Sequence, residues 1–141
     1  MEPYRIVLDT NCLLQILGSH SKYHFLLNEF LQGHYTLCVS TDILLEYEEI
    51  LKQKASPLAA ELFLKTIARS RNVEHKTPFF RLGIITQDYD DNKFVDCAFV
   101  CQADFIVTDD NHFSEAAQCK FPVFRIVSLD EFTQLMEPYR K

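Results

Sequence analysis

Five acidic residues stand where predicted strands end or predicted helices begin. Asp9 directly follows an apolar, β-branched run, Glu46 lies within two turns of a helix start, Asp91 opens a later helix, and Asp109 and Asp110 follow another apolar run. Carboxylate oxygens are the ligands that Mg²⁺ or Mn²⁺ prefers. Such an ion can drive phosphodiester hydrolysis, because it activates water and stabilises the departing oxygen. The alternative is that each aspartate only caps a helix, as aspartate often does.

The elements that must position these acids alternate along the chain. Apolar runs predict strands at 4–8, 35–39, 105–108 and 123–127, and helices are predicted at 11–17, 22–31, 41–54, 57–71, 91–102 and 129–135, with an irregular stretch from residue 73. This order predicts one domain, 1–141, with an α/β fold: a three-layer α/β/α sandwich around a central, mainly parallel sheet of about five strands. Because the carboxyl ends of parallel strands share one edge, the acids are expected to meet there.

Helical spacing refines the expected orientation of the acids. Asp91 precedes Phe94 by three residues and is expected to face inward with it, whereas Asp96 is expected to project to the solvated side. Glu46 lies beside the apolar stripe of its helix. An acid in such a place is costly unless a cation neutralises it. Since the sequence assigns no Arg or Lys to this edge, a divalent metal is the expected partner.

The composition is that of an ordinary globular chain. Of its 141 residues, 48% are hydrophobic and 24% are charged, and no apolar run reaches the length that a membrane helix needs. The amino terminus does not resemble a signal peptide, and five cysteines without framework spacing indicate a reducing interior, so a cytoplasmic location is expected. The five histidines are scattered and show no metal-ligand spacing, and neither a glycine-rich phosphate loop nor a nucleophile elbow is present.

The charge is unevenly distributed. Residues 88–110 contain seven aspartates and one base, Lys93, so this segment alone carries the formal net charge of −6. The segment from Lys52 to Arg81 contains seven basic residues and only two acidic ones. An acidic segment and a basic flank in one small domain are unusual, and the alternative is that both are simply the charged, solvated faces of helices.

Four segments together resemble one known family. They are Val7–Asn11, Ser40–Tyr47, Asp90–Phe94 and Ala103–Asp110, and they span most of the chain in the family's order. The chain resembles the PIN-domain nucleases, in particular a bacterial branch of toxins from toxin–antitoxin pairs. The resemblance implies a metal-dependent ribonuclease that hydrolyses phosphodiester bonds in single-stranded RNA, with Mg²⁺ or Mn²⁺ as cofactor.

The resemblance also assigns roles to individual residues. The implied catalytic metal ligands are Asp9, Glu46, Asp91 and Asp110. The implied supporting residues around them are Asn11, which would orient Asp9, and Thr108, Asp90, Asp96 and Asp109. Relatives often carry a glycine or another small or polar residue at position 109, so the sequence leaves open which acid of the 109–110 pair approaches the metal.

Binding partners follow from the same resemblance. Single-stranded RNA is the expected substrate, and the residues expected to contact its backbone are Lys52, Lys54, Arg69 and Arg71. An antitoxin protein is the expected partner, covering the acidic edge, and relatives are commonly dimers or larger homo-oligomers.

Two other functions remain open on sequence grounds. The first is a PIN-like module that binds RNA or protein without catalysis, which the presence of all four acids disfavours. The second is a Mg²⁺-dependent phosphatase or receiver-type domain. Phosphatases of the haloacid type need a second acid two residues after the first, and here Asp9 is followed by Thr10 and Asn11.

Overall fold

A five-stranded parallel sheet forms the centre of the fold. The computed structural model describes residues 2–140. The strand order is β3-β2-β1-β4-β5, and every neighbouring pair is parallel. The strands are β1 (Tyr4–Leu8), β2 (Tyr35–Val39), β3 (Val73–His75), β4 (Phe105–Val107) and β5 (Ile126–Val127). The predicted parallel α/β sheet is therefore confirmed.

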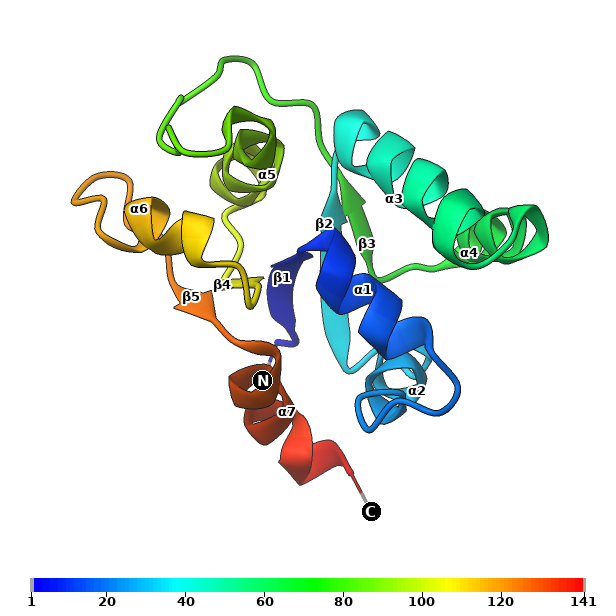
Figure 1. Cartoon of the computed structure of the whole chain (residues 1–141). Coiled ribbons are helices and arrows are strands. Elements are labelled where there is room, and N and C mark those ends of the chain that lie inside the picture. Colours follow the sequence, from blue (N-terminus) through cyan, green and yellow to red (C-terminus); the bar gives the residue numbers. More distant parts are fainter. Residues whose placement is uncertain (1, 141) are drawn as a thin grey trace.

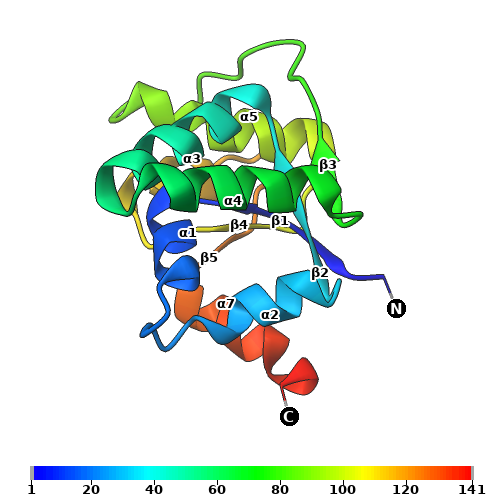
Figure 2. The same cartoon turned by 90° about the vertical axis from the view of Figure 1, so that its right-hand side faces the viewer.

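Helices cover both faces of this sheet. They are α1 (Thr10–Leu17), α2 (Phe25–Leu31), α3 (Thr41–Lys54), α4 (Pro57–Arg69), α5 (Asn92–Cys101), α6 (Ser114–Ala117) and α7 (Leu129–Met136). Helices α3, α4 and α5 lie on one side of the strands, and α2 and α7 lie on the other (Figures 1 and 2). This gives the predicted three layers. None of the helices among residues 2–140 is long and apolar enough to cross a membrane.

Local sequence explains where the helices begin. The Ser40 hydroxyl accepts the backbone N–H of Ile43 at 3.3 Å, and the Ser56 hydroxyl accepts that of Ala59 at 3.0 Å. Ser128 and Glu131 form a reciprocal capping box at the start of α7. Each bond satisfies a backbone donor that the first helical turn leaves free.

The register of the two central strands sets the position of the site. Leu8 of β1 pairs with Val107 of β4, so both strands end at the same level. The backbone N–H of Asp9 then donates to the carbonyl of Val107 at 3.0 Å. As a result, the residues that follow β1 and β4, Asp9 and Thr108, lie side by side at one edge of the sheet.

Several predicted boundaries differ from the observed ones. The expected strand 123–127 is reduced to Ile126–Val127, and the helix expected to reach residue 71 ends at Arg69. Tyr89–Asp91 forms a separate 3₁₀ turn before α5 begins at Asn92, and β3 and α6 were not predicted. These elements have only two to four residues, too few to show a periodic pattern in the sequence.

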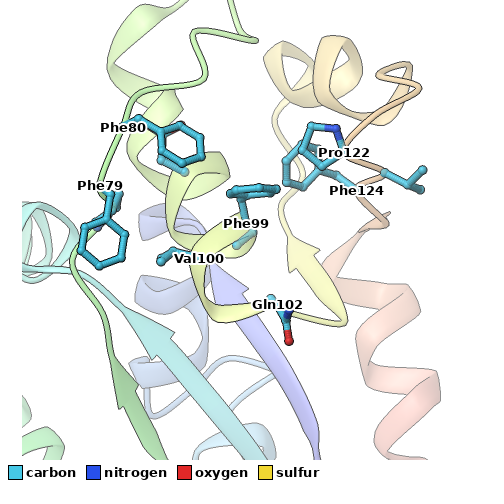
Figure 3. Close-up of a pocket in the computed structure, with 12 residues that line it drawn as sticks. Phe79, Phe80, Phe99, Val100, Gln102, Pro122 and Phe124 are labelled. Atoms are coloured by element: carbon cyan, nitrogen blue, oxygen red, sulfur yellow. The ribbon is translucent and has the colours of Figure 1, made fainter.

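An apolar hollow lies on the outer face of the carboxyl half of α5. Its volume is about 530 Å³, and the rings of Phe80 and Phe99 meet there edge to face with centroids 5.6 Å apart (Figure 3). Phe79 is 90% exposed at its border, and Pro122 lies on the opposite wall. Because Asp91 precedes the other end of α5, the hollow is separate from the acidic edge.

Candidate metal centre

Asp9 is a buried carboxylate at the end of β1. It is 7% exposed, and its Oδ2 accepts the Thr108 hydroxyl at 2.7 Å. Burial, with the charges of Asp110 and Glu46, raises the pKa of Asp9, although the Thr108 bond and the backbone amide of Asn11 oppose the rise. The hydrogen bonds that the protein supplies therefore do not fully offset the cost of a negative charge on the Asp9 carboxylate.

In the structure, the Thr108 side chain contacts and orients Asp9. Asn11 is exposed at the start of α1, and only its backbone amide bears on Asp9. Thr108 both donates to Asp9 and accepts the backbone N–H of Asp110 at 3.0 Å. The supporting role expected for the Asn11 side chain stays a prediction, and in the structure this residue is exposed at the start of α1.

Asp91 lies in a cluster with Asp88 and His112. One ligand atom from each lies within 4.8 Å of the other two. His112 Nδ1 is 3.5 Å from Asp91 Oδ2, 3.7 Å from Asp88 Oδ2 and 3.4 Å from Asp110 Oδ1. Burial and the neighbouring acids Asp88, Asp110 and Asp9 raise the pKa of Asp91 to about 6.

Two polar atoms in this cluster have no hydrogen-bond partner among residues 2–140. They are Asp91 Oδ2 and His112 Nδ1, and both are buried. A buried polar atom without a partner is rare and costly. An arriving cation would satisfy both atoms and offset the mutual repulsion of the carboxylates.

The structure separates the roles of Asp109 and Asp110. Asp109 Oδ1 accepts the backbone N–H of Leu129 at 3.1 Å, which turns Asp109 toward the start of α7. Asp110 Oδ1 accepts the backbone N–H of His112 at 2.9 Å and lies beside the imidazole. Of the two neighbouring acids, Asp110 therefore belongs to the cluster around Asp9 and Asp91.

Glu46 already has partners from the protein. One oxygen accepts the Thr10 hydroxyl, and the other lies 2.6 Å from Lys93 Nζ. The ammonium group also bonds Asp90 at 3.0 Å. Burial opposes its charge, but the bonds to Glu46 and Asp90 outweigh this effect and raise the pKa of Lys93. The expectation that no lysine reaches this edge is wrong, because the side chain spans from the start of α5 to α3.

Asp96 differs from the expected solvated residue. It is only 7% exposed, and its Oδ1 accepts the backbone N–H of Leu82 at 3.0 Å. The irregular segment after β3 folds over this side of α5 and excludes solvent. Asp96 therefore anchors that segment, and burial raises its pKa despite the Leu82 bond.

The four basic residues expected to contact RNA lie away from the acids. Lys52 and Lys54 are in the last turn of α3, and Arg69 ends α4. Helix α3 starts at the acidic edge, and at 1.5 Å per residue its end is about 20 Å from its start. Arg69 and Arg71 precede β3, so they lie toward the opposite edge of the parallel sheet. These four basic residues and the metal centre therefore lie on distinct surfaces.

The donor set fits a divalent cation. Asp9, Asp91 and Asp110 offer carboxylate oxygens, and Asp91 has the unpaired buried oxygen. Oxygen donors suit Mg²⁺ or Mn²⁺, and the ring nitrogen of His112 adds one softer donor beside them. The cluster is thus an acidic site that could bind a metal, and the full ligand set of Asp9, Glu46, Asp91 and Asp110 stays a prediction.

Sequence reasoning missed four residues of this site. They are Thr10, Asp88, Lys93 and His112, which contact the predicted acids. His112 lies two residues after Asp110, a short spacing that could have drawn attention to it. Lys93 and Glu46 are 47 residues apart in the sequence and lie on two different helices, so only the fold reveals their contact.

Comparison with known proteins places the chain in a family. A model of the PIN domain matches residues 5–112, and the chain belongs to the PIN domain family. A comparison with curated protein sequences finds no match.

Several solved structures share the fold. VapBC2 from Rickettsia felis bound to a promoter DNA fragment has 15% identity and a TM-score of 0.60, covering 88% of this chain and 98% of that chain. Mycobacterium tuberculosis VapC20, a sarcin-ricin loop cleaving toxin, has 15% identity and a TM-score of 0.57, with 79% and 94% covered. The PIN domain endonuclease Utp24 has 20% identity and a TM-score of 0.53, with 89% and 85% covered.

Proposed function

We propose that the protein is a metal-dependent endoribonuclease that hydrolyses phosphodiester bonds in single-stranded RNA. The observation that carries the proposal is the cluster of Asp88, Asp91 and His112, with Asp110 beside the imidazole and a buried oxygen of Asp91 left unpaired. The charges of Asp110 and Asp9 also raise the pKa of Asp91. Two similar structures support the choice of reaction, since VapC20 is described as a loop-cleaving toxin and Utp24 as an endonuclease.

Different residues of the site would bind the ion and position its ligands. Asp9, Asp91 and Asp110 would hold the ion, with Asp88 and His112 beside Asp91. When bound, a divalent ion lowers the pKa of water and neutralises charge on the phosphate. Thr108 holds Asp9 and the backbone of Asp110 in one arrangement, so these two carboxylates do not have to be ordered when the ion arrives.

The test is cleavage of a labelled single-stranded RNA in Mn²⁺, Mg²⁺ or EDTA, comparing the natural chain with Asp9→Asn. Asparagine keeps the size of the side chain and removes the charge, so the fold should persist while metal binding weakens. We expect cleavage that needs metal and is lost in the variant. Absence of cleavage by the natural chain, together with no metal binding in calorimetry, would favour the non-catalytic binding module. Hydrolysis of small phosphate esters instead of RNA would favour the phosphatase.

We also propose that the protein acts in the cytoplasm as the toxin of a toxin–antitoxin pair. The structures from Rickettsia felis and Salmonella typhimurium are VapBC complexes, and the latter has a TM-score of 0.54 and 16% identity, with 92% of this chain and 99% of that chain covered. An antitoxin would cover the acidic edge, and homo-oligomerisation stays a prediction. Co-expression with the adjacent reading frame, followed by purification of a complex, tests the pairing.

The position of the basic flank predicts an effect that depends on substrate length. Charge reversal at Arg69 and Arg71 should weaken binding of a long RNA and reduce its salt dependence, because these residues lie far from the metal centre and reach only an extended strand. A short RNA that fills only the centre should bind the variant and the natural chain equally. Fluorescence anisotropy at several salt concentrations measures both. If the variant and the natural chain bind the long RNA with equal affinity, Arg69 and Arg71 are not part of the RNA-binding surface.

A further inference from the structure

The carboxylates at the acidic edge fall into two groups: those that lack a partner within the protein and those that already have one. In the first group, Asp91 has a buried oxygen without a partner among residues 2–140. In the second group, both oxygens of Glu46 are occupied, one by the Thr10 hydroxyl and one by Lys93 Nζ. The protein therefore leaves room for a cation beside Asp91 and has already supplied one beside Glu46.

Lys93 differs from an ordinary surface lysine. Its side chain is 15% exposed, and that of Glu46 is 20% exposed, so their contact of 2.6 Å is largely shielded from solvent. A second carboxylate, Asp90, holds the ammonium group at 3.0 Å. The shielded contact with Glu46 fixes the nitrogen, whereas an exposed pair such as Lys65 with Glu61, where each side chain is more than half exposed, does not.

The ammonium group also borders an open hollow that it shares with Glu46 and Asp90. The hollow has a volume of about 520 Å³ and lies between the start of α3, residues 77–83 and the 3₁₀ turn before α5. Tyr89 and Thr41 border the same hollow. An ammonium group has three N–H donors, and the two carboxylates use two of them. One donor thus remains for a group that enters this space.

We propose that Lys93 is a catalytic residue that occupies the place of a second metal ion, with Glu46 and Asp90 holding its ammonium group against a non-bridging oxygen of the scissile phosphate. The inference rests on the proposed ribonuclease function and refines it. It assigns a single divalent ion to Asp9, Asp91 and Asp110, and it makes Glu46 a positioning residue for Lys93. A fixed cation aimed at charge that develops in the transition state acts mainly on kcat.

The experiment compares Lys93→Met with the natural chain, using Mn²⁺ as the probe. Calorimetry should find one Mn²⁺ per natural chain. Removal of Lys93 leaves Glu46 and Asp90 without a counter-charge, so the variant should retain the first ion and gain a second, weaker one. At Mn²⁺ concentrations that saturate only the first ion, kcat should fall by about 100-fold with a smaller change in KM. Higher Mn²⁺ should restore part of the loss.

Controls separate this role from a structural one. Lys65→Met removes another ion-paired lysine and should change neither ion stoichiometry nor kcat. Lys93→Arg, which keeps the charge, should retain more activity than Lys93→Met and serves in its place if the methionine variant does not fold. Two Mn²⁺ ions on the natural chain, or equal kcat in both Lys93 variants and the natural chain, would overturn the inference. Failure of the natural chain to cleave RNA would instead count against the proposed function.

Discussion

Replacement of Asp110 by asparagine is expected to reduce RNA cleavage about 1,000-fold, since a lost metal ligand removes several kcal/mol of transition-state stabilisation. The same replacement at Asp109 should leave cleavage within a few-fold of the natural chain. Asp110 lies 3.4 Å from His112 in the acidic cluster, whereas Asp109 accepts a backbone bond from Leu129 at the start of α7. Single-turnover cleavage in saturating Mn²⁺ measures both variants.

The pair is a matched control, because the two substitutions are chemically identical and adjacent in the sequence. An asparagine in place of Asp109 would still offer an oxygen to the backbone of Leu129, so only a small loss of stability is expected there. Thermal melting of both variants establishes that each is folded under the assay conditions. A greater loss of activity in the Asp109 variant than in the Asp110 variant would reverse the assignment of the metal ligand.

The fold could be predicted well because its longer elements carry strong local signals. The apolar runs of β1 and β2 match the predicted ranges, and α3 and α4 begin at the predicted residues, α3 after a Ser40 cap and α4 at Pro57. The short elements β3 and α6 carry no such signal, because their residues are ordered by contacts with the rest of the fold. The parallel arrangement then brings the strand ends together, which is why the acidic edge itself was predictable.

The finer structure of the site depends on contacts between distant segments. Asp96 was expected in solvent because helical spacing places it away from the core, but the segment that contains Leu82 covers it. Lys93 was expected to be a lone base among aspartates, yet its length allows it to reach Glu46 on another helix. Periodicity assigns a side chain to a face of its own helix, and it says nothing about which irregular segment covers that face.

In the absence of metal, Asp91→Asn is expected to stabilise the protein at pH 7 to 8. The pKa of Asp91 is raised to about 6 in the folded chain by burial and by Asp88, Asp110 and Asp9, and an unfolded aspartate titrates near 3.9. This carboxyl thus contributes stability below pH about 4 and loses that contribution as the pH rises through about 6. Removal of the charge should add about 2 kcal/mol at neutral pH, after allowance for solvent screening.

Thermal melting in EDTA across the pH range tests this expectation, with Mn²⁺ added in a parallel series. The gain in Tm from Asp91→Asn should be largest at neutral pH and should vanish near pH 4, where the natural chain is itself protonated. Mn²⁺ should raise the Tm of the natural chain more than that of the variant, because binding to the folded state alone stabilises it. Asp90→Asn is the neighbouring control: its carboxylate is 75% exposed and bonds Lys93, so no gain is expected. A lower Tm for Asp91→Asn in EDTA at neutral pH would mean that the Asp91 charge is satisfied within the protein, and the case for a metal at this carboxylate would fail.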